Sequence, residues 1–291
     1  MINRLPVWFK QEIPENIGSV RNRLRLFENL GLYTVCRSAC CPNVSGCFKN
    51  NHVTFMIMGP NCSRHCAFCA VAKGVPVPLN SSEAYKVALS LRGLNLKYAV
   101  ITSTTRDDLP SGGATQFTRV TYLVRTLNPG IKIELLIPDF KGSLAALGLV
   151  VRSSPDVIAH NLETVRRLYP EVRPQGNYHL ALSIFKKIRK LGFAHLTKSG
   201  IMLGLGETED EVIKTMRDLR SAGCDIFTLG QYLAPSAEHF PVKEFVCPEK
   251  FDFYRRKALS LGFKAVSAGP LVRSSYQAEE TYSNSLHQTD K

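Results

Sequence analysis

Residues 53–69 read VTFMIMGPNCSRHCAFC, an apolar run followed by three closely spaced cysteines. The run Val53–Met58 predicts a short buried strand, which a Gly-Pro pair ends. The thiols of Cys62, Cys66 and Cys69 therefore follow a strand directly, in a loop at its carboxyl end. In α/β folds this is where active sites usually lie.

A second group of thiols lies just upstream. Cys36, Cys41 and Cys47 form a CxxxxCxxxxxC pattern. Each of the two triplets has one cysteine fewer than the four thiolates that normally hold a [4Fe–4S] cluster. A cluster with three protein ligands has one iron open to another molecule. The triplets therefore predict two [4Fe–4S] clusters, each with an open coordination site where chemistry can occur.

Zinc and disulfides are two other uses of cysteine. Cys66 and Cys69 match half of a zinc pattern, but a structural zinc site needs a second pair, and the other thiols are spaced by four and five residues. The chain is long, has nine cysteines and begins Met-Ile-Asn-Arg-Leu-Pro, without an export signal, so a disulfide framework is disfavoured as well.

The CxxxCxxC pattern resembles that of the radical S-adenosylmethionine superfamily. The resemblance implies that Cys62, Cys66 and Cys69 hold a cluster whose open iron binds the amino and carboxylate groups of S-adenosylmethionine. Reductive cleavage of this cofactor gives a 5′-deoxyadenosyl radical. That radical removes hydrogen atoms that no side chain could remove as a base, so the cofactor carries the difficult step.

The upstream triplet, directly before CxxxCxxC, is similar to that of the lipoyl synthase family. Further blocks of resemblance are spread over nearly the whole chain: Ile101–Ser103, Arg106–Pro110, Gly112–Ala114, Leu136–Phe140, His160–Thr164, Tyr169–Gln175, Thr197–Met202, Gly204–Glu207, Gly230–Tyr232 and Gly269–Tyr276. The two triplets with the final Arg-Ser-Ser-Tyr are the specific part. The family implies a sulfurtransferase that inserts two sulfur atoms, at C6 and C8 of a protein-bound octanoyl-lysine, and takes them from its auxiliary cluster.

The same resemblance implies the ligands of that auxiliary cluster. It assigns them to Cys36, Cys41, Cys47 and the oxygen of Ser275, with Ser274 as the alternative serine. Serine is a hard ligand on a soft, thiolate-bound cluster, so its iron is expected to be released most easily. The residues alone would favour an exposed polar tail here.

The chain departs from the family pattern at two places. Cys40 stands beside Cys41, where the family more often has a residue without a thiol, although the spacing still selects Cys41 as the ligand. Thr104-Thr105 precede the Arg-Asp-Asp block, where the family commonly has an acidic or amide residue. The second departure leaves one polar contact near the cofactor open.

After the cysteine loop, strand-like and helix-like segments alternate. The expected strands are Phe55–Met58, Tyr98–Thr102, Ile131–Ile137, Val157–Ala159, Thr197–Leu203 and Ile226–Leu229, and clear amphipathic helices are Ala181–Leu191 and Glu209–Ala222. Repeated β-then-α segments indicate a parallel sheet. Six strands agree with the partial (β/α)6 TIM-like barrel of radical enzymes, with extensions at both ends.

This pattern predicts three regions. Residues 1–50 form an amino-terminal extension with the auxiliary triplet, 51–268 the partial barrel, and 269–291 a carboxyl-terminal segment with Arg-Ser-Ser-Tyr and a polar tail. We expect the tail from Gln277 to be loosely ordered.

Three further residues are candidate cofactor contacts. Asn161 and Glu163 follow a strand, at the end of a barrel where active-site groups gather. Glu207 follows Gly204-Leu205-Gly206, where two glycines allow close approach of the backbone to a ligand, and its carboxylate could bind an amine or a ribose hydroxyl. An ordinary turn with an acidic residue at a helix start explains Glu207 equally well.

Composition and charge limit the kinds of partner that the chain can have. The formal net charge is +13, and a basic surface can steer an acidic partner. The resemblance implies octanoylated lipoyl carrier domains or an H-type protein of glycine cleavage as substrates, an electron donor such as flavodoxin or ferredoxin, and an iron–sulfur carrier protein. The longest apolar stretch, Leu144–Val151, is too short to cross a membrane. Labile clusters and reduced thiols predict a cytoplasmic protein.

A transfer RNA substrate is the alternative. Radical methylthiotransferases share CxxxCxxC and use two clusters, but they carry a long amino-terminal domain with widely spaced cysteines and a carboxyl-terminal RNA-binding module. Here the first triplet is compact and the chain ends soon after Tyr276. We therefore expect no nucleic-acid partner.

Overall fold

The computed structural model describes residues 5–9, 17–49 and 52–287. The predicted boundary between the amino-terminal extension and the barrel, at residues 50–51, lies outside the described residues. So do residues 288–291 at the end of the predicted polar tail.

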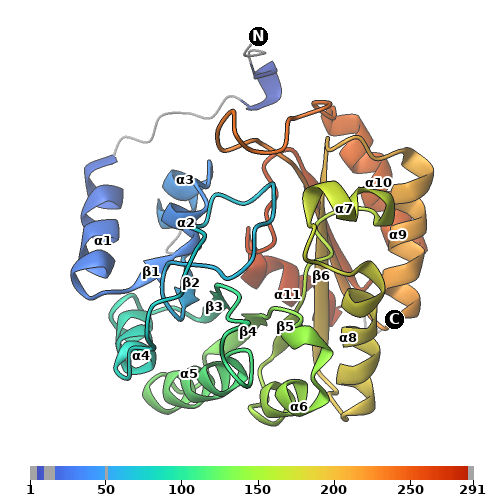
Figure 1. Cartoon of the computed structure of the whole chain (residues 1–291). Helices are drawn as coiled ribbons and strands as arrows, with labels where there is room; N and C mark the ends of the chain where they lie inside the picture. The colour runs from blue at the N-terminus through green and yellow to red at the C-terminus, as the bar shows by residue number, and fades with distance from the viewer. Residues whose placement is uncertain (1–4, 10–16, 50–51, 288–291) are drawn as a thin grey trace.

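One curved sheet organises the molecule (Figure 1). Its strands are hydrogen-bonded in chain order: β1 (Tyr33–Thr34), β2 (Thr54–Ile57), β3 (Tyr98–Ser103), β4 (Lys132–Leu136), β5 (Val157–Ala159), β6 (Leu196–Leu203), β7 (Ile226–Gln231) and β8 (Ala265–Gly269). β1 is antiparallel to β2, and every later pair is parallel.

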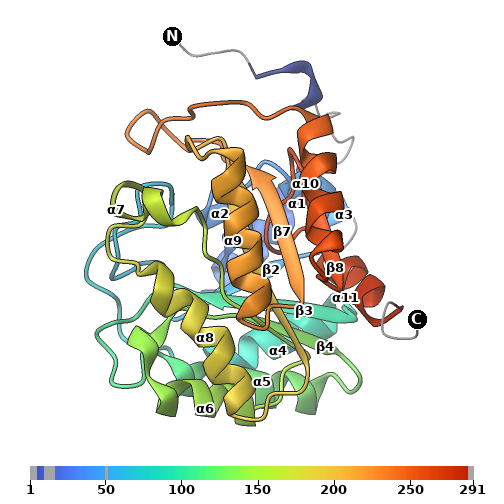
Figure 2. The same cartoon turned by 90° about the vertical axis from the view of Figure 1, so that its right-hand side faces the viewer.

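Six helices alternate with the parallel strands and cover the outside of the sheet (Figures 1 and 2). In chain order they are α4 (Glu83–Gly93), α5 (Ala114–Leu127), α6 (Leu144–Arg152), α8 (Tyr178–Lys190), α9 (Glu209–Ser221) and α10 (Pro248–Ser260). The predicted partial (β/α)6 barrel is thus confirmed. The expectation of six strands was too low, because β8 continues the parallel sheet after the sixth helix and β1 extends its other edge.

The two helices predicted most clearly begin at side-chain caps. In α8 the Asn177 side chain accepts from the Leu180 N–H, at 2.8 Å. In α9 Thr208 and Glu211 form a capping box, which satisfies two backbone donors that a helix start leaves unpaired. These caps fix where each helix begins after its strand, and so they shape the loops at the carboxyl ends of the strands.

The outer face of the sheet forms the hydrophobic core. Phe55, Ile101 and Ile133 are fully buried beneath α4, α5 and α6, and Phe227 is fully buried beneath the helices of the second half. Burying such side chains is the main stabilising contribution to the fold. The inner face is more polar, which leaves the interior of the barrel available for a functional site.

The amino-terminal segment packs against the β2 edge of the sheet. The part packed there comprises α1 (Ile17–Asn29), β1, α2 (Val35–Ser38) and α3 (Val44–Lys49), whereas the ring of Phe9 in η1 (Val7–Phe9) contacts that of Phe245, before α10. The ring of Phe27 in α1 contacts that of Phe55 in β2, with centroids 5.2 Å apart. Cys36 lies in α2 and Cys47 in α3, so this packing places the first thiol triplet beside the barrel opening.

The carboxyl-terminal tail is ordered as far as it is described, to His287, contrary to the expectation from its polar composition. Residues Ala278–His287 form α11, which contacts β3 and β8. Tyr282 packs against the first residues of four strands, Val157, Leu196, Ile226 and Ala265. Helix α11 therefore closes the amino-terminal end of the barrel. The remaining short helices are η2 (Phe140–Gly142), η3 (Arg166–Leu168) and α7 (Tyr169–Val172).

Candidate active site

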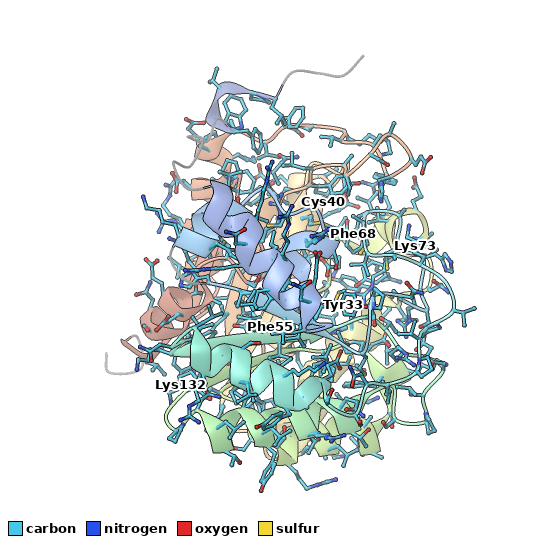
Figure 3. The ribbon with its side chains drawn as sticks, turned by 90° about the vertical axis from the view of Figure 1, so that its left-hand side faces the viewer. Tyr33, Cys40, Phe55, Phe68, Lys73 and Lys132 are labelled. Atoms are coloured by element: carbon cyan, nitrogen blue, oxygen red, sulfur yellow. The ribbon has the colours of Figure 1, made fainter. Side chains whose placement is uncertain are left out.

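A cavity of about 520 Å³ lies inside the barrel, and residues at the carboxyl ends of the strands, such as Ser103, Leu136 and Gln231, line it. Both thiol triplets line it, together with Asn161, Glu163, Ser274 and Ser275. The fold thus brings together side chains from the amino-terminal segment, the loop after β2, the end of β5 and the carboxyl-terminal segment. Figure 3 labels Cys40 and Phe68, which line the cavity from the two cysteine-bearing segments.

The loop with the second triplet is tied to the end of β3. The Thr105 N–H donates to Cys62 Sγ at 3.3 Å, the kind of contact that a thiolate ligand accepts. Ser63 binds the same residue, because its N–H and its hydroxyl both donate to the Thr105 carbonyl, at 3.0 and 2.9 Å. Thr105 is one of the two departures from the family pattern, and here its backbone serves the loop.

Arg64, within the CxxxCxxC, binds carboxylates that follow β3 and β4. Its guanidinium binds Asp107 after β3 (2.7 and 3.0 Å) and Asp139 after β4 (2.6 and 2.7 Å). Burial raises the pKa of Asp139, but the Arg64 hydrogen bonds and charge outweigh it and hold this pKa at about 2. Two bidentate contacts of this kind orient a side chain firmly. Arg64 is not among the residues predicted from the sequence, although its position between Cys62 and Cys66 is a signal that marks it.

The far side of the same loop is held by later segments. The His65 N–H donates to the Gln175 side chain at 2.6 Å, and the Ala67 N–H donates to the Val172 carbonyl at 3.0 Å. His239 Nε2 lies 3.2 Å from the Cys69 carbonyl oxygen. The loop is therefore anchored on all sides, which suits a site whose three ligands need fixed spacing.

All six cysteines of the two triplets are at least half covered by protein. The neighbouring Cys40, which belongs to neither triplet, is exposed. Burial raises the pKa of Cys69 to about 12, and burial together with nearby Cys41 raises that of Cys36 to about 11 and that of Cys47 to about 12. A buried thiolate needs a positively charged partner. Iron would supply this charge, and each thiol would lose its proton as it binds the iron. The soft donor sets fit the two predicted clusters. Among the described residues, no three His, Cys, Asp or Glu side chains converge closely enough for a single metal ion.

Asn161 and Glu163 lie at the cavity wall with Arg173, which the sequence reasoning had not singled out. Arg173 Nη1 donates to the Asn161 carbonyl at 2.9 Å. Burial raises the pKa of Glu163, against the opposing effects of Arg173 and an Asn161 hydrogen bond. Glu163 also has a left-handed backbone, with φ of 70°. For a residue other than glycine such strain is characteristic of functional sites.

Glu207 is placed differently from the other candidates. It is not among the residues that line the cavity, and its carboxylate accepts from the N–H groups of Gly204 and Leu205, at 2.5 and 2.9 Å. This geometry corresponds to the turn interpretation. Contact between Glu207 and the cofactor stays a prediction.

Comparisons with known proteins agree with this geometry. The chain matches the radical SAM superfamily over residues 56–219. It is 51% identical over 278 residues to a lipoyl synthase of Caldicellulosiruptor bescii, covering 95% of this chain and 94% of the relative. It is also 51% identical over 280 residues to one of Caldanaerobacter subterraneus subsp. tengcongensis, covering 96% and 97%.

Solved structures show the same fold at low identity. The crystal structure of methylornithine synthase aligns with a TM-score of 0.55 at 16% identity, covering 72% of this chain and 61% of that one. The structure of Streptococcus suis SuiB bound to S-adenosylmethionine aligns with a TM-score of 0.53 at 13% identity, covering 84% and 57%.

Proposed function

The chain belongs to the lipoyl synthase family of radical S-adenosylmethionine enzymes, and from this we propose how its residues divide the reaction among themselves. As a lipoyl synthase it is a sulfurtransferase that acts on a protein-bound octanoyl group and uses a [4Fe–4S] cluster with S-adenosylmethionine. The alternative of a transfer RNA methylthiotransferase is set aside, because the curated relatives that match almost the whole chain are lipoyl synthases.

We assign the reducing cluster and S-adenosylmethionine to Cys62, Cys66 and Cys69. The support is the anchored loop, the N–H donated to Cys62 Sγ and the position of all three thiols on one cavity. When bound, the two [4Fe–4S] clusters and S-adenosylmethionine supply the radical that abstracts hydrogen and the sulfide that replaces it at C6 and C8. Asn161 and Glu163, on the same cavity, are proposed to bind the polar groups of the cofactor.

We assign the auxiliary cluster to Cys36, Cys41, Cys47 and Ser275. All four line the same cavity as the reducing triplet, although they come from opposite ends of the chain. A substrate carbon held between the two sites would be within reach of both. This shared cavity is the single observation that carries the proposal.

The cavity wall suits an aliphatic chain. Val53, Met56 and Val100 contribute apolar surface between the auxiliary segment and the barrel, and each is buried. Burial of apolar surface is the main source of affinity that an octanoyl chain can use. We propose that these residues exclude water from the reacting carbons and hold the chain between the two triplets.

The wider assignments follow from the family. We propose octanoylated lipoyl carrier domains or an H-type protein of glycine cleavage as substrates, flavodoxin or ferredoxin as electron donor, and an iron–sulfur carrier protein that helps to rebuild the auxiliary cluster. Cytoplasmic location is proposed from the free thiols and the labile clusters. No helix in the described ranges is both long and apolar enough to span a bilayer.

We also keep the three regions as a proposal, with residues 1–50 carrying the auxiliary thiols, 51–268 the barrel and 269–291 the final ligand. The ordered α11 gives the third region a second task, which is closure of the barrel at the amino-terminal ends of its strands.

The assignment of the two triplets is tested by separating radical formation from sulfur insertion. Enzyme reconstituted anaerobically should hold about eight irons per chain and convert an octanoyl-lysine peptide to its lipoyl form. The triple replacement Cys36→Ala, Cys41→Ala, Cys47→Ala should still release 5′-deoxyadenosine but form no lipoyl product. Replacement of the second triplet should abolish both.

Cys247→Ala is the matched control, because this thiol is exposed at the start of α10 and is not among the residues that line the cavity. Sulfur insertion by the first triple variant would exclude Cys36, Cys41 and Cys47 as the ligands of the sulfur source.

A further inference from the structure

The segment Leu271–Tyr276 crosses the carboxyl end of the barrel and lines the cavity from residue 272 onward. Turns give it a defined shape: the Val272 N–H donates to the Gly269 carbonyl at 3.1 Å, and the Tyr276 N–H donates to the Arg273 carbonyl at 2.9 Å. Three contacts with distant parts of the chain then fix where this shape sits.

The first contact comes from the auxiliary segment. Asn43, between the ligand positions Cys41 and Cys47, donates from Nδ2 to the Leu271 carbonyl at 2.5 Å. Asn43 is only 4% exposed, so water cannot readily replace this acceptor. A buried amide without its partner is unfavourable, and the contact therefore resists separation of the two segments.

The second contact involves the serine pair. Ser274 Oγ donates to Asn161 Oδ1 at 3.1 Å, and Arg173 holds the backbone of Asn161 in turn. An oxygen that binds iron as an alkoxide has lost its proton and cannot donate in this way. Within the described part of the chain, the Ser275 hydroxyl has no hydrogen-bond partner. The Ser274 hydroxyl is thus occupied by Asn161, whereas the Ser275 hydroxyl is free to bind iron.

The third contact is a close backbone approach. A Cβ added at Gly230, at the end of β7, would clash with the carbonyl group of Val272. Only glycine permits this approach. The segment is therefore pressed against the barrel at Val272, one residue after the carbonyl that Asn43 holds.

We propose that Asn43 is a positioning residue for the auxiliary site, which acts through the Leu271 carbonyl to set the position of Ser275 relative to the three thiols. The inference rests on the proposed function, in which Ser275 is the fourth ligand. Residues 41–47 carry two of the thiols, Cys41 and Cys47. Through Asn43 they also hold the segment that carries Ser275. Neither atom of this contact is proposed as a ligand, so the contact would hold the segment whether or not Ser275 is bound to iron.

The test compares Asn43→Ala and Asn43→Asp with wild type in the anaerobically reconstituted full-length enzyme. The aspartate variant keeps the shape of the side chain but has no N–H to donate. Hydrogen–deuterium exchange of peptides covering 270–276 should be faster by about tenfold in both variants, as expected for one lost hydrogen bond. Mössbauer spectra should show the iron site with the serine ligand altered as in Ser275→Ala. Release of 5′-deoxyadenosine should persist, while lipoyl product per deoxyadenosine falls.

Asn128→Ala is the matched control, because the Asn128 amide also donates to backbone carbonyls, those of Ala88 and Val124, at 3.1 and 3.0 Å. None of these three residues lines the cavity. It should leave exchange of 270–276 and the Mössbauer spectrum unchanged. Because Asn43 acts through Ser275, the double variant Asn43→Ala, Ser275→Ala should form as much product as Ser275→Ala alone.

Unchanged exchange of 270–276 in both Asn43 variants would overturn the inference, and so would additive losses in the double variant. An unchanged Mössbauer spectrum in Ser275→Ala is a separate result. It would reject the serine ligand of the proposed function, whereas the exchange measurement would still decide whether Asn43 holds the segment.

Discussion

Cys40 and Cys41 are neighbours in the chain and both line the cavity, yet their surroundings differ. Cys40 is exposed and has a left-handed backbone, with φ of 49°. The thiol of Cys41 is close enough to Cys36 and Cys47 to contribute, after burial, to the raised pKa of each, whereas Cys40 has no such effect. The electrostatics therefore group Cys41 with the other two thiols, in agreement with the spacing argument.

This difference gives a prediction for single substitutions. Cys41→Ser should lose most of the auxiliary iron, about four per chain, because it removes one of three soft ligands. Cys40→Ser should keep the iron and nearly wild-type formation of lipoyl product. Iron analysis and product assays on the reconstituted variants decide the matter. The opposite pattern would move the ligand register by one residue.

A second prediction at this scale concerns Ser275 as the proposed fourth ligand of the auxiliary cluster. Ser275→Cys offers thiolate, a softer donor that iron–sulfur clusters bind more firmly. The auxiliary cluster should therefore be retained better, and lipoyl formation should fall below wild type because sulfide leaves more slowly. Iron content and the time course of product measure both effects. Ser274→Cys serves as the comparison, since Ser274 is already engaged by Asn161. A faster reaction in Ser275→Cys would contradict this account.

At the scale of elements, α11 is the least expected feature. Its ten residues carry few apolar side chains, so an isolated helix of this length would be marginal in water. Tertiary contacts supply what the sequence lacks. The ring centroids of Tyr282 and Tyr98 are 5.5 Å apart, and the Lys132 ammonium lies over the Tyr282 ring, 6.0 Å from its centroid. The helix is stable because the open end of the barrel offers it a surface to cover.

Removal of that surface contact should loosen the barrel. Tyr282→Ala is expected to lower the free energy of unfolding by about 2 kcal/mol, less than for a fully buried aromatic residue because the side chain is only half-buried. Urea unfolding followed by circular dichroism measures the change. Tyr122→Ala is the matched control, because this tyrosine is 69% exposed on α5. An equal effect in the two variants would show that α11 contributes little to closure.

At the scale of the whole molecule, one ion pair joins strands across the barrel interior. Lys198 on β6 binds Glu134 on β4 at 2.9 and 3.0 Å, and Tyr98 on β3 donates to the same carboxylate at 2.8 Å. The two charged side chains are each 1% exposed. Charges this deep are tolerated only in pairs, so the network fixes the relative positions of three strands around the cavity.

Lys198→Met should therefore destabilise the fold strongly, by about 3–5 kcal/mol, because it leaves the buried Glu134 carboxylate with the Tyr98 hydroxyl but without its positive partner. The double variant Lys198→Met, Glu134→Gln should recover part of the loss. Lys214→Met is the surface control, and removal of its exposed pair with Asp218 should cost at most about 1 kcal/mol. Equal losses for Lys198→Met and Lys214→Met in urea unfolding would argue against this role.

The sequence by itself determined the two thiol triplets, on which the family resemblance chiefly rests, and the repeating architecture. Both rest on short-range information. The spacing of Cys62, Cys66 and Cys69 is contained in eight residues, and the alternation of apolar strands with amphipathic helices is visible segment by segment. For this reason the predicted strand Tyr98–Thr102 and the helix Glu209–Ala222 each match the structure to within one residue at either end.

Only the tertiary structure decided which distant residues meet. Ser274 and Asn161 are 113 positions apart, and Asn43 and Leu271 are 228 apart, so no local pattern relates them. The same holds for α11, whose polar sequence reads as a loose tail until the barrel provides its packing surface. Periodicity reports on neighbours along a helix or strand, whereas these contacts depend on how the curved sheet brings distant parts of the chain together.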